Sequence, residues 1–128
     1  MSRANERYPD GFLAFLAFLC SKYKVDRSSI LVEYNKDTPP RLRGNIPGYY
    51  DGLLSHRERN GRSEFLITVF AVASNPLLTL GHEFAHLVED LATRTPRGTL
   101  APPDEARERG FDRIAMRDLD EFRSKVSK

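Results

Sequence analysis

The stretch LGHEFAHL, residues 80–87, predicts a helix that carries a metal site. Its apolar positions recur as on one face of a helix, and residues four apart in a helix lie one above the other. His82 and His86 are therefore expected to project side by side, close enough for both imidazoles to bind one ion. The chain has 3 histidines in all, and two of them fall in this spacing. Two neutral imidazoles suit zinc, which in catalytic sites takes a third protein ligand and keeps one position open.

Glu83 lies between the two histidines, next to the place where a zinc-bound water would sit. A glutamate at this position of H-E-x-x-H can act as general base toward that water. A purely structural metal site has no need of a general base. The motif therefore favours hydrolysis by a metal-activated water, with Glu83 as the catalytic residue.

A second motif, EARERGFDRIA at residues 105–115, supplies candidates for the third ligand. Together the two motifs resemble the zincin metallopeptidases of the gluzincin type, which take a glutamate from a later helix. The metzincin continuation H-x-x-G-x-x-H is not present after His86. The resemblance implies zinc bound by His82, His86 and Glu108. Asp112, four residues after Glu108, is expected to accept a hydrogen bond from a ligating histidine and fix its tautomer.

Two other carboxylates compete with Glu108 for the third position. Glu105 follows His86 with 18 residues between them, the spacing of aminopeptidase-type gluzincins. We prefer Glu108, because it shares its helix face with apolar residues and has Asp112 in the supporting position. Glu89 ranks last, because its side chain would have to bend back along its own helix. The choice between Glu108 and Glu105 stays open at this stage.

The remaining elements follow from turn and capping signals. Asn75 and Pro76 are a favourable cap and first residue for the motif helix, and Asn60-Gly61 is a strong hairpin turn signal. Asp10 and Asp104 are expected to cap the first and last helices. The predicted elements are a helix over 11–24, strands over 29–34, 49–56 and 64–71, and helices over 76–92 and 105–124.

This order of elements predicts an α+β fold in a single domain, residues 1–128. The resemblance implies a minimal zincin-like domain in which a short three-stranded meander packs on the N-terminal helix, the motif helix and the C-terminal glutamate helix. In size and layout it is similar to the archaeal minigluzincins and, less closely, to ImmA/IrrE-like peptidase domains. The implied function is a small zinc-dependent peptidase with a peptide or protein substrate, active or latent. The alternative is a zincin-fold interaction or regulatory module with little or no peptidase activity.

Composition sets the broad class of the protein. The chain of 128 residues has a net charge of +2, too weak to indicate nucleic-acid binding. The longest apolar run, residues 12–20, is far shorter than the roughly 20 residues that span a bilayer, so no membrane association is expected. The single cysteine, Cys20, permits no internal disulfide, which is typical of a reducing compartment, and we expect a cytoplasmic location. The oligomeric state stays open.

Four further expectations concern the neighbourhood of the site. Tyr49, Tyr50 and His56 are oxyanion-stabilising candidates by residue type alone, although His56 is expected to be structural or solvated rather than a ligand. The third strand is a candidate edge for an extended peptide. The basic tail over 123–128 is considered as a plug for the cleft, with a frayed helix end as the alternative. Gly110 would be explained by a close approach to the motif helix.

Overall fold

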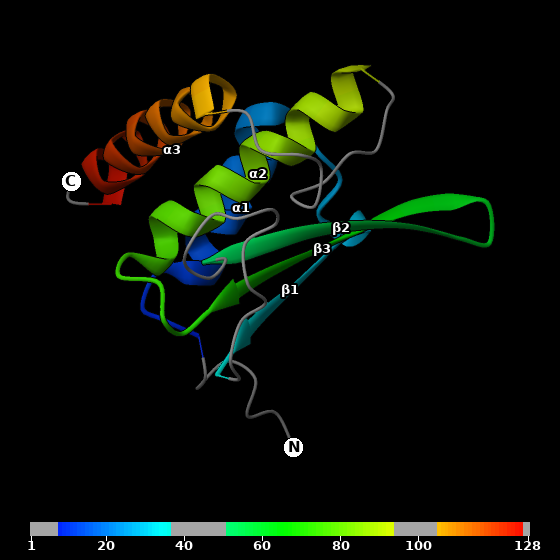
Figure 1. The fold of residues 1–128 in the computed structure, drawn as a ribbon, viewed down its shortest axis with the longest axis horizontal. Coiled ribbons are helices and arrows are strands. Elements are labelled where there is room, and N and C mark those ends of the chain that lie inside the picture. The colour runs from blue at the N-terminus through cyan, green and yellow to red at the C-terminus, as the bar shows by residue number, and fades with distance from the viewer. Residues whose placement is uncertain (1–7, 37–50, 94–104, 127–128) are drawn as a thin grey trace.

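A computed structural model describes residues 8–36, 51–93 and 105–126, which form three helices and a small three-stranded mixed sheet. The predicted α+β class and the predicted order of elements are confirmed (Figure 1). Asp104, Tyr49 and Tyr50 lie outside the described residues. The elements in chain order are helix α1 (Phe12–Tyr23), a 3-10 turn η2 (Arg27–Ser29), strands β1 (Ile30–Asn35), β2 (Gly52–Arg59) and β3 (Arg62–Phe70), and helices α2 (Pro76–Thr93) and α3 (Glu105–Val126).

The sheet is not the predicted meander. Its order is β1-β3-β2, with β1 parallel to β3 and β2 antiparallel to β3. Phe65 of β3 lies opposite Ile30 on one side and His56 on the other. β2 follows β1 in the sequence but lies at the opposite edge of the sheet, an order that local sequence patterns cannot reveal. β3 is therefore the central strand, and the expectation that it offers a free edge to a peptide is wrong.

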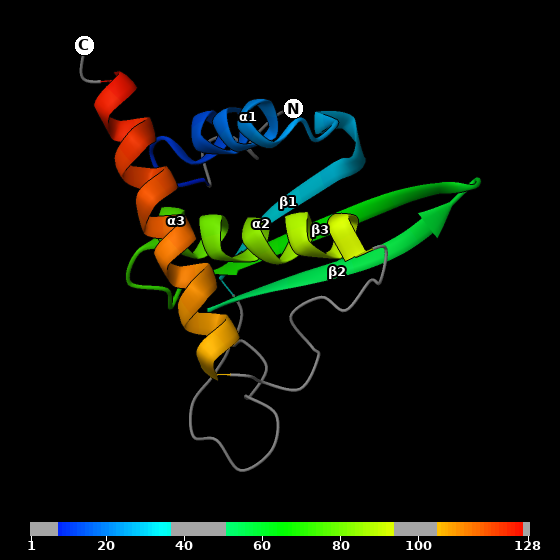
Figure 2. The same cartoon turned by 90° about the horizontal axis from the view of Figure 1, so that it is seen from above.

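The hairpin between β2 and β3 has the predicted turn. Asn60 (φ 53°) and Gly61 (φ 76°) both adopt the left-handed conformation that a two-residue type I′ connection needs. Asparagine and glycine are the residues that adopt it at least cost. The hairpin extends beyond the helices, away from α3 (Figures 1 and 2).

The start of α1 differs from the prediction, while the start of α2 agrees with it. At α1 the cap is Gly11 (φ 79°) with no side-chain cap bond, because the carbonyl of Pro9 accepts the N–H of Phe12 and fills the role predicted for Asp10. At α2 the side chain of Asn75 accepts a hydrogen bond from the N–H of Leu78 at 3.2 Å, and Pro76 is the first helical residue.

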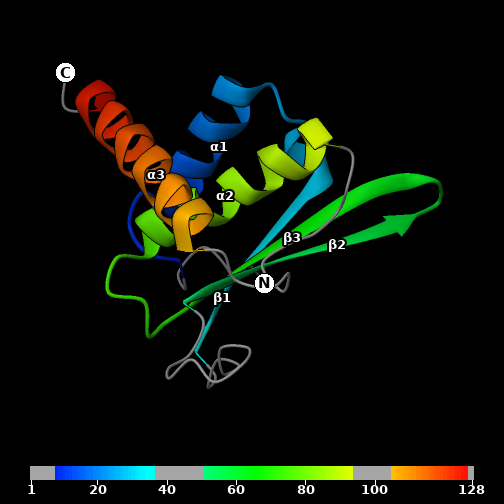
Figure 3. The ribbon, with the colours of Figure 1, turned by 45° about the horizontal axis from the view of Figure 1, so that its top comes forward.

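Helices α1 and α2 lie side by side on one face of the sheet, and α3 crosses them (Figures 2 and 3). The core between these layers is apolar and rich in phenylalanine, and Cys20 is buried in it. The side of α3 predicted to be apolar is buried at every position: Phe111, Ala115, Leu119 and Phe122. No helix in the described ranges combines the length and the apolar character of a membrane span.

A glycine does mark the close approach of α2 and α3, but it lies on α2. A Cβ added to Gly81 would lie 3.1 Å from the Cβ of Ala115 and 3.4 Å from its Cα. A Cβ added to Gly110 would have no neighbour within 4 Å, so the predicted explanation of Gly110 is wrong. The residue that approaches α2 at Gly81 is Ala115, which lies five residues beyond Gly110. Gly81 immediately precedes His82, so the closest packing lies next to the metal motif.

Candidate metal centre

Helix α2 presents both histidines of the motif to α3. The rings of His82 and His86 lie with their centroids 5.1 Å apart, as expected for residues one turn apart on one helix face. His86 is buried, with 2% of its side chain exposed, and His82 is largely buried. The ring of Phe111 on α3 lies 4.2 Å from that of His86 and 5.9 Å from that of His82. The two imidazoles therefore share an apolar backing that limits their rotation.

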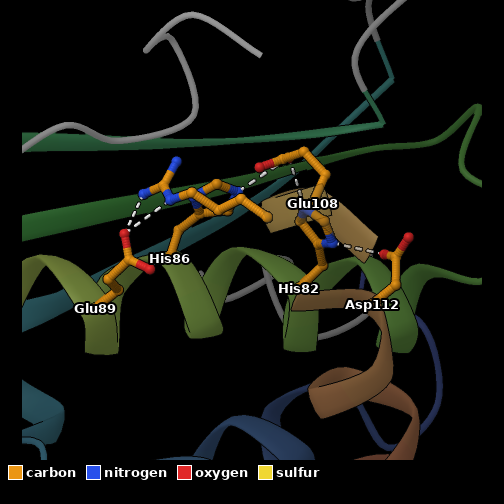
Figure 4. Close-up of polar contacts among 6 residues, drawn as sticks. His82, His86, Glu89, Glu108 and Asp112 are labelled. Atoms are coloured by element: carbon orange, nitrogen blue, oxygen red, sulfur yellow. Dashed lines mark hydrogen bonds and ion pairs between the residues drawn. The ribbon is translucent and has the colours of Figure 1, made fainter. Parts of the chain in front are cut away.

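Glu108 completes the group from α3. Its Oε1 atom lies 3.1 Å from Nε2 of His82 and 3.2 Å from Nε2 of His86 (Figure 4). These three ligand atoms lie within 4.8 Å of one another, so the group could hold a metal ion. Zn–N and Zn–O bonds of about 2.0–2.1 Å in a tetrahedron would separate two ligand atoms by roughly 3.3 Å. The two separations from Glu108 are therefore compatible with a metal ion bound by all three residues.

Asp112 supports one of the two histidines, as the sequence predicted. Its Oδ1 lies 2.6 Å from Nδ1 of His82 (Figure 4). A neutral His82 would donate its Nδ1–H to this carboxylate and turn the lone pair of Nε2 toward Glu108. Such a contact fixes the tautomer and raises the basicity of a ligating imidazole.

The second histidine is supported differently. The buried Nδ1 atom of His86 has no hydrogen-bond partner within the described part of the chain. Its orientation is instead constrained by burial and by the Phe111 ring. The two imidazoles therefore share Glu108 but differ in what holds them on the far side.

The pKa values of His82 and Glu108 are both shifted by the charged and hydrogen-bonding groups around them. Burial alone would lower the pKa of His82, but the bond to Glu108 and the charges of Glu83 and Asp112 raise it to about 9. Burial alone would raise the pKa of Glu108, but its bonds to His82 and His86 lower it to about 2. A proton on His82 thus bridges to the Glu108 carboxylate in the space where a divalent ion would lie.

The competing carboxylates take other places. Glu89 accepts hydrogen bonds from Nε of Arg107 at 2.8 Å and from Nη2 of Arg107, so it belongs to an ion pair beside the group and not to the group itself. Glu105 opens α3, but its side chain is not among those the structure describes. Sequence reasoning did not predict the Arg107–Glu89 pair, because it joins two helices across an 11-residue connection.

Glu83 is buried on α2, with 3% of its surface exposed. Strand β2 begins against it, at a glycine that sequence reasoning did not single out. A Cβ added to Gly52 would lie 2.7 Å from Cγ2 of Thr79 and 3.2 Å from Cγ of Glu83. Only glycine permits this approach of β2 to α2. A glycine inside a predicted strand often indicates close backbone approach. This signal could have identified Gly52 from the sequence.

The other predicted neighbours lie elsewhere or outside the described part. His56 is not in the metal-binding group, and its ring packs 5.0 Å from that of Phe65. The tail is helical through Val126, and the helix rises by roughly 22 Å between Glu108 and Arg123. The described part of the tail therefore does not fill the site of its own chain, and residues 127–128 lie outside the described residues.

Comparisons of the chain with protein-family models, with curated proteins and with solved structures found no match. The functional interpretation therefore depends on the geometry and chemistry of the group formed by His82, His86 and Glu108.

Proposed function

We propose that this chain is a small zinc-dependent peptidase of the zincin type, with the gluzincin ligand set His82, His86 and Glu108. The observation that carries the proposal is the position of Glu83. Glu83 is buried, and in the sequence it lies between two histidines whose Nε2 atoms both contact Oε1 of Glu108. Burying a carboxylate away from water costs free energy, so its presence beside the two histidines favours a chemical role. A hydrolytic site requires one as general base.

The donor set supports zinc as the metal. Two imidazole nitrogens and one carboxylate oxygen are typical of catalytic zinc, which keeps its fourth position open. Glu108 is the most accessible of the three, with 34% of its side chain exposed, so the group lies at an accessible surface rather than in a closed cage. When bound, zinc supplies a Lewis acid that polarises the scissile carbonyl and acidifies the attacking water.

Glu83, Asp112 and Gly52 have the other roles in the proposed site. Glu83 accepts the proton of the attacking water and passes it to the leaving amine. Asp112 holds His82 by its Nδ1 atom, so that Nε2 keeps facing the metal position. Gly52 lets β2 approach Glu83, which restricts the space in which the carboxylate can move.

The sheet suggests how a peptide would be held. Of the three described strands, β1 and β2 are at the edges, and β2 begins against Glu83. A peptide that extends the sheet through backbone hydrogen bonds would therefore align with β2 to bring its scissile bond near Glu83. This replaces β3 as the strand proposed for substrate binding.

The test is a peptide-library digestion by the wild-type chain, with and without a chelator, beside Glu83→Gln. Glutamine keeps the shape of the side chain but cannot accept the proton. The variant should keep its zinc, because Glu83 is not a ligand, and should lose cleavage by orders of magnitude. Equal cleavage by both proteins would overturn the assignment of Glu83. Zinc binding without any cleavage by the wild type would favour the interaction or regulatory module.

A further inference from the structure

Arg107 lies directly before Glu108 in the first turn of α3, where a movement of the backbone would displace the Glu108 side chain. The first backbone N–H groups of a helix have no partner within the helix, and such ends open more readily than helix centres. A small movement of this turn would carry the Glu108 carboxylate away from both histidines. The position of Oε1 therefore depends on whatever holds the first turn of α3 against α2.

The side chain of Arg107 reaches α2 through an ion pair with Glu89. Two guanidinium nitrogens, Nε and Nη2, donate to the same oxygen of Glu89. Glu89 lies one turn after His86 on α2, so the pair lies beside the ligand group (Figure 4). Cζ of Arg107 also lies 5.0 Å from the centre of the Phe111 ring, which in turn packs on His86. Only 18% of the Arg107 side chain is exposed, so solvent screens the pair incompletely.

We infer that Arg107 is a positioning residue for the metal centre: its ion pair with Glu89 holds the first turn of α3 so that Glu108 stays over His82 and His86. This inference rests on the proposed metal site. Contacts behind metal ligands commonly change affinity 10–100-fold. Arg107 acts through the backbone of its neighbour, so we expect a loss of about tenfold in zinc affinity when its charge is removed.

Simple electrostatics predicts the opposite sign. A guanidinium next to a cation site repels the incoming ion, so removing it should tighten zinc binding if charge alone mattered. The guanidinium is also not a ligand, and its removal takes no bond from the metal. A loss of affinity in an arginine-to-neutral variant would therefore come from geometry and not from charge.

The experiment measures zinc affinity by competition with a chromophoric chelator for wild type, Arg107→Gln and Arg113→Gln. Arg113 is an exposed arginine of the same helix and serves as the matched control. We expect Arg107→Gln to bind about tenfold more weakly and Arg113→Gln to stay within about twofold of wild type. Unchanged or tighter binding by Arg107→Gln would overturn the inference. A wild type that binds no zinc would instead overturn the metal centre itself.

Charge reversal gives a second, independent readout. Arg107→Glu should weaken zinc binding more than Arg107→Gln, because it places two carboxylates together at position 89 and position 107. Combining it with Glu89→Arg restores an ion pair across the two helices and should recover most of the lost affinity. Failure of the double variant to bind better than Arg107→Glu would contradict the inference. This comparison also decides the question if Arg107→Gln proves unstable, and far-ultraviolet circular dichroism of each metal-free variant shows whether it is folded.

Discussion

The two halves of α3 are attached to the rest of the molecule in different ways. The C-terminal half meets α1 through Asp118, a carboxylate with 1% of its surface exposed. Tyr23 donates to its Oδ2 at 2.6 Å, and Nζ of Lys22 donates to its Oδ1 at 2.7 Å. Next to it the ring of Phe122 packs 5.2 Å from that of Phe15. Both oxygens of this buried carboxylate are hydrogen-bonded, so this half needs no ion to be stable.

The N-terminal half meets α2 through Glu108, which with His82 and His86 could hold a metal ion. Glu108 and Asp112 approach His82 from opposite sides, and the pKa of His82 is raised to about 9 as a result. A proton satisfies this arrangement in the metal-free protein. The difference teaches that α3 is anchored by one half and offers a site with the other. Substitutions in the two halves should therefore separate stability from metal binding.

The largest expected effect on stability is that of Asp118→Ala. The variant removes the hydrogen bond that the Tyr23 hydroxyl donates to a charged group, and such bonds contribute about 1.5–3 kcal/mol. Lys22 is partly exposed and keeps its second contact to Glu121, so we expect a total of about 2–3 kcal/mol. Urea unfolding of the metal-free protein measures it. Glu108→Ala should destabilise the metal-free protein less than Asp118→Ala, and the reverse order would contradict the proposed division between the two halves.

Sequence reasoning predicted the elements that depend on local rules. The histidine spacing, the cap and proline at Asn75 and Pro76, and the turn at Asn60-Gly61 each need only a few neighbouring residues. The support of a ligating histidine by Asp112 followed from the resemblance and from the position of Asp112, four residues after Glu108 on the same face of a predicted helix. These are the features that the structure confirms.

Other features depend on contacts between distant segments, which spacing does not encode. The parallel pairing of β1 with β3 is decided by where the chain re-enters the sheet. The anchoring role of Asp118 requires knowing that α1 passes beside α3, and the pairing of Arg107 with Glu89 requires the crossing of α2 and α3. Asp10 does not cap α1, because the backbone carbonyl of Pro9 accepts the N–H of Phe12 instead.

A pair of glycine substitutions tests where the two helices meet. Gly81→Ala places a methyl group 3.1 Å from the Cβ of Ala115, and overpacking of this kind costs about 1–3 kcal/mol, partly offset by the better helix propensity of alanine. Gly110→Ala meets nothing within 4 Å and should stabilise the protein by up to about 1 kcal/mol. Thermal unfolding of both variants shows whether each substitution lowers or raises the stability of the protein. Stabilisation of equal size by both would show that the helices do not approach at Gly81.

A further expected effect is a pH dependence confined to the metal-free protein. The folded pKa of His82 is about 9, above its ordinary value of 6.5, so its contribution to stability is complete below pH 6.5 and is lost as pH rises through about 9. Metal-free wild type should therefore lose stability over this window more steeply than His82→Gln. Urea unfolding at several pH values measures both. Equal slopes would contradict the protonated His82–Glu108 contact.

The central claim is that His82, His86 and Glu108 hold one zinc ion per chain, and chelator competition across four variants tests it most directly. Wild type should bind about one equivalent of zinc. His82→Ala, His86→Ala and Glu108→Ala should each lose most of the affinity, because each removes one bond to the ion. Glu105→Ala should stay near wild type. Full retention of zinc by both histidine variants would contradict the site, and a larger loss in Glu105→Ala than in Glu108→Ala would contradict its third ligand.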